Sequence, residues 1–303
     1  MPDGTYETET VAMEPVVTVG LDGSPESLAA ARWAADEADR RRLTLRLLHA
    51  WPLLVPESSK VPAEMDQNYW ARRIVHKARA ELQRSHPGLP VVGSLVADDA
   101  QHALLRAASE SEMTVLGSRG LVPLESYFLG DISLPVVARA DRPVVLVRAG
   151  AGGHGAPPAP AVKGGVVVAL KLHGPCDGLL EFAFTDAAAR GVPLRVVHGQ
   201  SLPVAAYAPW GVDHDVAEEI AQDARKRLDR VLRPWRDRFP RVEVDDRIVL
   251  ESPAKAVVSA AHGAGLLVVG RREHRPAPAP HLGPVAQAAI HHAHCPVAVV
   301  PHT

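Results

Sequence analysis

The sequence has 303 residues, a length that corresponds to about two domains. Hydrophobic residues make up 47% and charged residues 22%, which excludes wholesale disorder, and the net charge of −2 gives no overall basic attraction to nucleic acid or to an anionic membrane. No apolar run reaches the about 18 residues of a transmembrane helix, the acidic start of the chain does not have the pattern of a secretory signal, and two cysteines are too few for a disulfide framework, so we expect a cytoplasmic protein.

Strand and helix patterns alternate along the first half of the chain. The apolar run Val16–Leu21 is typical of a strand buried on both faces, and Ser24 and Pro25 after it suit a helix N-cap and a first helical position. Helical spacing continues to Arg42, and a later, longer helix is expected to turn Trp70 inward. The further elements are, in order, a strand at 43–49, a loop at 51–62, the long helix at 63–85, a strand at 90–97, a helix at 98–109 capped by Asp98, a strand at 113–117, a loop at 118–129, a short helix at 130–140 and a strand at 143–147.

The second half of the chain repeats this order. Leu43–His49 is similar to Val192–His198 at a spacing of 149 residues, and Arg142–Val147 is similar to Cys295–Val300 at a spacing of 153. The difference corresponds to one small insertion between otherwise collinear copies. Between the copies, the Gly-, Ala- and Pro-rich run Ala149–Pro160 is typical of a linker.

We therefore predict an α/β fold of two tandem, doubly wound domains, each with a five-stranded parallel sheet. The expected divisions are a disordered tail at residues 1–14, a first domain at 15–148, a linker at 149–163 and a second domain at 164–303. In such sheets ligands bind at the carboxyl ends of the strands, where the strand order reverses. The loops after the first and fourth strands of each domain are thus the candidate sites.

Glycine and polar residues follow both of these strands in the first domain. Gly20 and Asp22 end the first strand, and a carboxylate there can accept hydrogen bonds from a ribose hydroxyl or an adenine amine, or hold a divalent ion. The fourth strand ends at Gly117–Gly120, where Arg119 could neutralise a phosphate, and Gly130–Ser133 begins the next helix. Glycines and helix starts offer backbone N–H groups to phosphates, although glycines in turns are often turns alone.

This pattern resembles the universal stress protein family in its tandem, two-domain form. The resemblance rests on Val19–Pro25, on His49–Trp51 and on the glycine loop. The family's ATP-binding motif is Gly-x2-Gly-x9-Gly-Ser/Thr, and Gly117, Gly120 and Gly130 match its glycines. The resemblance implies an ATP site, with or without Mg²⁺, formed by Gly20, Asp22, Ala50, Gly117, Ser118, Arg119, Gly120, Gly130, Asp131 and Ser133.

One motif position departs from the family. Asp131 stands where the family has Ser or Thr, and an ionised carboxylate cannot donate a hydrogen bond to phosphate. Its repulsion at ~4 Å would cost about 1 to 4 kcal/mol. Ser133 as a substitute donor, or a divalent ion between Asp131 and the phosphates, would restore binding. Alternatively, Asp131 only caps its helix and the site is empty.

The second copy departs further from the motif. Lys171 stands in the place of Asp22, Glu273 replaces the middle glycine and Pro284 replaces the hydroxyl residue. The acidic side chain opposes phosphate and the proline removes an N–H donor. We expect nucleotide binding in the first domain only, with the second as a structural partner.

Three other patterns have structural interpretations. Arg40–Arg42 is expected to be a solvated helix face, and His49 and His198 end matching strands, which suggests a shared structural role. The cluster His291–Cys295 is expected to be a solvated helix end and not a metal site, because adjacent residues on a helix point in different directions.

By resemblance, the protein is a nucleotide-responsive regulator of the stress response, with no catalytic residues. Nucleotide would order the loop at 118–129 and so bias the binding of an unknown protein partner. The resemblance also implies that strands 143–147 and 296–300 pair across a pseudo-two-fold axis, and a homodimer of the whole chain is expected. The rival interpretations are a nucleotide-free interaction scaffold and a slow ATPase in which Asp22 and Mg²⁺ position a water.

Overall fold

The alternation of strands and helices is confirmed in the computed structural model, which describes residues 15–51, 67–118, 132–149, 164–203, 207–208, 211–212, 214–272 and 282–302. The first half contains β1 (Val16–Gly20), α1 (Pro25–Arg41), β2 (Thr44–Ala50), α2 (Gln67–Ser85), β3 (Val91–Val96), α3 (Ala100–Ser109), β4 (Met113–Ser118), α4 (Ser133–Arg139) and β5 (Val144–Arg148). The second half contains β6 (Val166–Ala169), α5 (Asp177–Arg190), β7 (Leu194–Gly199), β8 (Tyr207–Ala208), β9 (Gly211–Val212), α6 (His214–Arg238), β10 (Val244–Val249), α7 (Pro253–Ala260), β11 (Leu266–Arg272), α8 (Pro284–His292) and β12 (Val297–His302).

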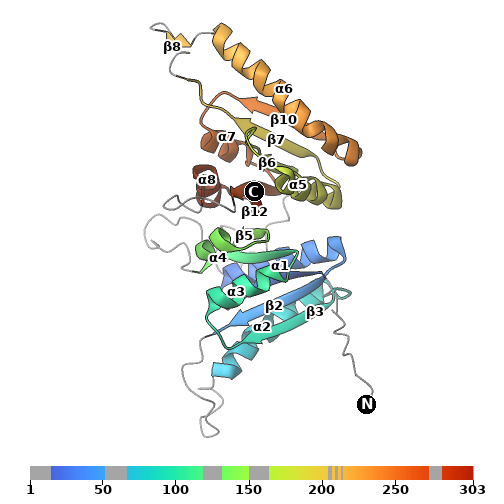
Figure 1. Ribbon diagram of the computed structural model, residues 1–303. Coiled ribbons are helices and arrows are strands. Elements are labelled where there is room, and N and C mark those ends of the chain that lie inside the picture. The colour runs from blue at the N-terminus through green and yellow to red at the C-terminus, as the bar shows by residue number, and fades with distance from the viewer. Residues whose placement is uncertain are drawn as a thin grey trace, which may run out of the picture.

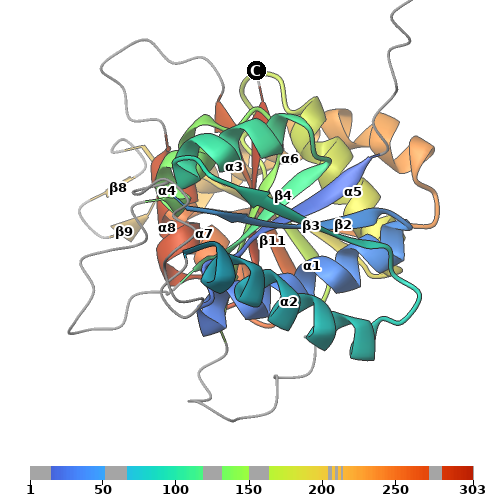
Figure 2. The ribbon, with the colours of Figure 1, turned by 90° about the horizontal axis from the view of Figure 1, so that it is seen from below.

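The two halves share one continuous sheet. Its order is β10-β7-β6-β11-β12-β5-β4-β1-β2-β3, with helices on both faces (Figures 1 and 2). Within each half the neighbouring strands are parallel, as right-handed βαβ crossovers require. The small hairpin β8–β9 lies outside this sheet.

The halves join through their fifth strands. β5 and β12 are antiparallel, with Val144 opposite Val299 and Leu146 opposite Val297. The pairing implied by the family resemblance is therefore confirmed. Because β5 and β12 pair with each other, β3 and β10 are the two outer strands of the sheet. The predicted homodimer stays a prediction.

Apolar side chains form one core on each face of the sheet, and both cores cross from one half to the other. On one face, α1 and α5 pack against the central strands, and Val17, Phe184 and Leu228 belong to the same cluster. On the other face, the cluster joins α3 and α4 to α7 and α8. We infer that neither half keeps its full core without the other.

The start of α1 forms as its sequence predicts. The Ser24 hydroxyl accepts a hydrogen bond from the Ser27 N–H at 3.1 Å, and Pro25 occupies the first turn. At the start of α3 the N-cap is Asp99, whose carboxylate accepts from the His102 N–H at 3.0 Å, so the prediction that Asp98 caps this helix is wrong.

Two expectations about side-chain exposure are also wrong. Trp70 is 49% exposed, because the buried residues of α2 at helical spacing lie one position further on, at Ala71, Val75 and Leu82. Arg41 is not on a solvated face: it lies between α1 and α5, paired with buried carboxylates of both helices. No helix in the described ranges has both the length and the apolar character needed to cross a membrane.

Candidate functional site

Three strand ends of the first domain meet at one edge of the sheet. Gly20, Ala50 and Ser118 are the last residues of β1, β2 and β4, and β1 pairs with both of the other strands. The strand order reverses here, so this edge is the expected ligand position of a doubly wound sheet. Ser133 is the first residue of α4. Four of the ten predicted site residues, Arg119, Gly120, Gly130 and Asp131, lie outside the described residues.

The turn after β1 holds Asp22 in a defined position. Its carboxylate accepts a hydrogen bond from the Ser24 N–H at 2.9 Å, and Gly23 between them has φ +83°, a left-handed conformation that favours glycine. Local hydrogen bonds thus place an acceptor at the carboxyl end of β1.

Two of the site glycines lie close to neighbouring parts of the protein. A Cβ on Gly117 would lie 2.6 Å from the carbonyl carbon of Glu26 and 2.7 Å from the Ser27 nitrogen, so this glycine lets β4 approach the start of α1. A Cβ on Gly20 would lie 2.7 Å from Leu116 Cδ2. Packing therefore requires Gly117 whether or not a ligand binds, whereas a Cβ at Gly20 would require only the Leu116 side chain to shift.

Two buried polar groups at this edge have no hydrogen-bond partner among the residues that the structure describes. The Ser118 side chain is buried, with 6% of the residue exposed, and its hydroxyl has no hydrogen-bond partner among the described residues. The buried Trp51 indole N–H is in the same condition, while its ring stacks on His49 with centroids 5.9 Å apart. An unsatisfied buried polar group costs about 1–3 kcal/mol. In the sequence, Trp51 is part of the motif His49–Trp51, and no local pattern predicts that its indole N–H is buried.

The turn after β6 repeats the local structure with different chemistry. His49 Nδ1 lies 2.7 Å from the Leu21 carbonyl oxygen, and His198 Nδ1 lies 2.9 Å from that of Leu170. The shared structural role of the two histidines is therefore confirmed. By this equivalence Lys171 occupies the position of Asp22, which places a cation where the first domain has an acceptor.

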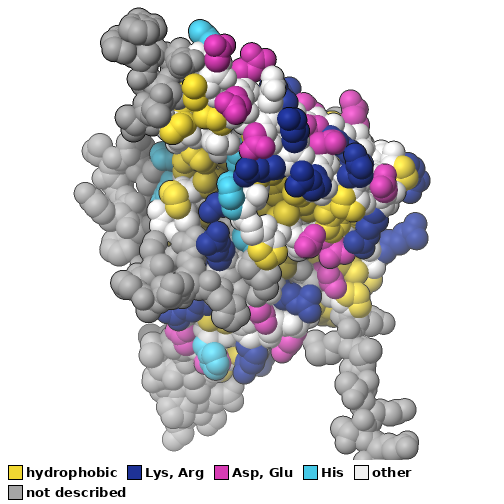
Figure 3. Space-filling model, turned by 45° about the horizontal axis from the view of Figure 1, so that its top comes forward, with side chains coloured by type: hydrophobic (Ala, Val, Ile, Leu, Met, Phe, Trp, Pro, Cys, Tyr) yellow, Lys and Arg dark blue, Asp and Glu magenta, His cyan; other side chains and the backbone are white. Residues whose placement is uncertain are grey.

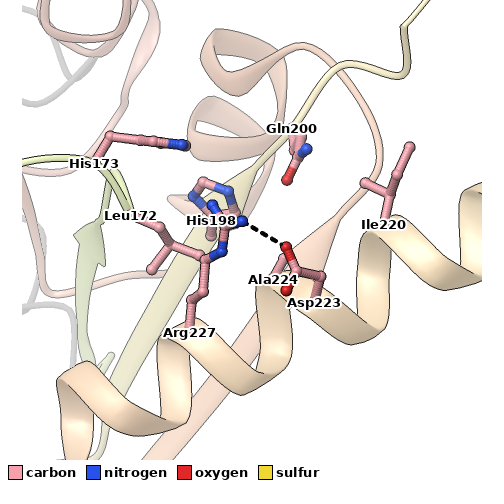
Figure 4. Close-up of a pocket in the computed structure, with 8 residues that line it drawn as sticks. All are labelled: Leu172, His173, His198, Gln200, Ile220, Asp223, Ala224 and Arg227. Carbon is pink, nitrogen blue, oxygen red and sulfur yellow. Dashed lines mark ion pairs between the residues drawn. The ribbon is translucent and has the colours of Figure 1, made fainter.

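A small cavity lies beside this second turn. His173, His198 and Gln200 face it from the strand side, and Asp223 and Arg227 face it from α6 (Figure 4). Its volume is about 120 Å³, below the about 300–1,000 Å³ that is typical of small-molecule pockets. The Arg227 guanidinium is already paired with Asp223 at 2.7 Å.

The end of β11 also differs from the end of β4. Arg271 occupies the position of Ser118, and its buried guanidinium donates to the Ala140 carbonyl oxygen at the end of α4. α8 begins with Pro284, which has no N–H to donate. This edge of the second domain therefore contributes to the contact between the halves.

The described residues contain no group of three or more His, Cys, Asp or Glu side chains placed to hold a metal ion. On the face seen in Figure 3, basic and acidic side chains are interspersed, without a large field of one sign. Such a face gives no electrostatic preference for a polyanion.

Comparisons with known proteins agree with this architecture. The model of the universal stress protein family matches residues 15–148 and 165–301. Two universal stress proteins of Mycobacterium tuberculosis are 30% and 31% identical to this chain over 93% of its length, and the matches cover 94% and 96% of those proteins. The crystal structure of a universal stress protein from Archaeoglobus fulgidus has a TM-score of 0.65 at 17% identity and covers 96% of this chain and 100% of that one, which shows the same fold. The chain belongs to the universal stress protein family, with two family units in tandem.

Proposed function

We propose that the first domain binds an adenine nucleotide, ATP, at the edge formed by β1, β2 and β4, and that the protein is a nucleotide-responsive regulator of the stress response. The observation that carries the proposal is the buried Ser118 hydroxyl, which has no partner among the described residues and follows the first motif glycine. A phosphate oxygen would accept its hydrogen bond and remove the cost of leaving it unsatisfied.

The residues at this edge have complementary roles in the proposal. Asp22 would accept hydrogen bonds from the nucleoside, and the backbone at Ala50 would line the base. Ser118 and Ser133 would donate to phosphate oxygens, with Arg119 as the counter-charge. Asp131 opposes the phosphates, and bound Mg²⁺ would supply the positive charge that offsets it.

The second domain is proposed not to bind nucleotide. Lys171, Arg271 and Pro284 replace the acceptor, the hydroxyl and an N–H donor of the first domain. The neighbouring cavity of about 120 Å³ is smaller than typical small-molecule pockets, which are about 300–1,000 Å³. These replacements support a single nucleotide site per chain.

We propose regulation and not catalysis. Asp22 is the carboxylate that the first domain offers to a nucleotide, and it already accepts a hydrogen bond from the Ser24 N–H. No paired nucleophile and base accompanies it among the described residues of this edge. A nucleotide would act through its differential affinity for two states of the 118–129 loop, and the surface of that loop would contact a protein partner.

Calorimetric titration of the full chain with ATP, with and without Mg²⁺, tests the proposal. Ser118→Ala is expected to weaken ATP binding at least fivefold without lowering the melting temperature, because this hydroxyl has no partner to lose in the described part of the chain. Asp131→Ser is expected to strengthen ATP binding. Ser259→Ala, which removes a hydroxyl from α7 of the second domain, is the control for Ser118→Ala and is expected to leave ATP binding unchanged. If neither the wild type nor Asp131→Ser binds ATP, the proposal is wrong. Binding by Asp131→Ser alone would make the natural protein a nucleotide-free scaffold.

A further inference from the structure

A second difference between the domains lies at the amino-terminal ends of their strands, whereas the differences described above lie at the carboxyl ends. In the first domain, Arg46 of β2 stands opposite Thr18 of β1 and Val92 of β3. In the second domain, Arg195 of β7 stands opposite Val167 of β6 and Asp245 of β10. The two arginines therefore occupy equivalent positions with different neighbours.

Arg46 is fully engaged in the first domain. Its Nε donates to the Thr18 hydroxyl at 2.8 Å, and one terminal nitrogen pairs with Glu110 at 2.7 Å. The other terminal nitrogen donates to the Ala107 carbonyl at 2.9 Å and to the Ser111 hydroxyl at 3.1 Å. These contacts join the head group to the end of α3 and to the residues that follow it.

Each side-chain partner is missing from the second domain. Gly263 and Ala264 stand in the places of Glu110 and Ser111, and this equivalence is fixed by the backbone: the Ser111 and Ala264 N–H groups both donate, at 3.1 Å, to the third residue before them. Val167 replaces Thr18, as the strand register shows. Compared with the first domain, the second domain therefore lacks two hydroxyl groups and one carboxylate around this arginine.

A cavity of about 570 Å³ occupies the vacated region. It is lined by the counterparts of Arg46 and of its three side-chain partners, which are Arg195, Val167, Gly263 and Ala264. This volume lies within the about 300–1,000 Å³ that is typical of small-molecule sites. The cavity lies among the amino-terminal ends of the strands of the second half, whereas the proposed nucleotide site lies at the carboxyl ends of the strands of the first half, so the two sites share no lining residue.

The Arg195 side chain pairs with β10 through only one of its three guanidinium nitrogens. Its Nε donates to Asp245 at 3.1 Å, and its two terminal nitrogens have no partner among the described residues. Its side chain is 38% exposed, so it is accessible. The Asp245 carboxylate also forms an ion pair with the Arg247 guanidinium at 2.9 Å. The other ionisable groups that line the cavity are Glu243 and His262.

We propose that this cavity binds a small organic carboxylate. The two free terminal nitrogens of Arg195 present the planar fork that a carboxylate accepts in two parallel hydrogen bonds. Val167 and Ala264 provide an apolar surface for the body of such a molecule. Asp245 is shared by the guanidinium groups of Arg195 and Arg247, and Glu243 also lines the cavity, so the preference for a carboxylate rests on the Arg195 fork and not on an excess of positive charge.

Ligand-observed NMR titration of the full chain tests this site with butyrate, and with butylammonium and inorganic phosphate as comparisons. Butyrate is expected to bind saturably and more tightly than either. Arg195→Gln is expected to weaken it at least tenfold, and Arg195→Lys also, because lysine keeps the charge without the fork. The double variant Val167→Thr/Ala264→Ser restores two hydroxyls of the first domain and is expected to weaken butyrate by drawing Arg195 inward.

Ser118→Ala is the control for independence from the nucleotide site and is expected to leave butyrate binding unchanged. Circular dichroism of each variant establishes that it is folded. No saturable butyrate binding, equal binding of butylammonium or phosphate, or butyrate binding that survives in folded Arg195→Gln would overturn the proposal. Loss of butyrate binding in Ser118→Ala would also overturn it.

Discussion

The Arg41 guanidinium of α1 donates to the Asp186 carboxylate of α5 at 2.8 Å, across the junction between the two halves. The equivalent Arg190 of α5 donates back to Glu37 of α1 at 2.6 Å. Each arginine also pairs with the carboxylate four residues earlier on its own helix. The interface is therefore a closed, pseudo-symmetric ring of four charges, and both carboxylate side chains are fully buried.

Arg41→Met is expected to lower the free energy of unfolding by about 3–5 kcal/mol, because it leaves two buried carboxylates with one fewer cation. The matched control is Arg40→Met. Arg40 also pairs with Glu37, but its side chain is 28% exposed, so we expect a loss of about 1 kcal/mol or less. Urea unfolding of both variants measures the difference, and equal losses would show that the ring does not stabilise the junction.

The two buried carboxylates have opposite pKa shifts. Burial alone would raise the pKa of Glu37, but the guanidinium groups of Arg190 and Arg41 lower it to about 2. Burial raises the pKa of Asp186 to about 6, and the neighbouring Glu37 charge adds to the rise against the pull of Arg190. The pair thus titrates in two separated steps.

These shifts predict how stability depends on pH. Glu37 contributes stability above its ordinary pKa of 4.5, and this is lost as the pH falls toward 2. Asp186 binds its proton more tightly in the folded state, so its contribution is complete below 3.8 and is lost as the pH rises toward 6. Asp186→Asn should remove the decline between pH 4 and 6 in urea unfolding. An unchanged decline in this variant would assign it to other groups.

Local sequence patterns predicted the alternating strands and helices of the large sheet, because nearby apolar spacing and caps code for them, but they did not predict the hairpin β8–β9. Ser24 and Pro25 begin α1 as expected. The run Arg40–Arg42 has the same pattern as a solvated helix end, and the difference is that α5 lies against it, which depends on contacts about 145 residues away. Long-range partners of this kind leave no local signal.

The candidate site was predictable to a similar extent. The spacing of glycines and strand ends was enough to bring Gly20, Ala50 and Ser118 to one edge. It could not separate glycines needed for a ligand from glycines needed for packing, because that depends on which backbone passes nearby. The structure supplies this for Gly117, which lies against α1.

Gly117→Ala is expected to destabilise the protein by about 1–3 kcal/mol even without nucleotide, because the new methyl would meet the backbone of Glu26 and Ser27, which cannot rotate away. Gly270→Ala at the equivalent position of β11 is the matched comparison. There the nearest atoms belong to the His302 ring, at 2.7 Å, and a side chain can rotate about its own bonds whereas the backbone of α1 cannot. We therefore expect a smaller loss in Gly270→Ala when both are unfolded in urea. Equal losses would mean that the start of α1 adjusts as readily as His302. Packing would then not require a glycine at position 117.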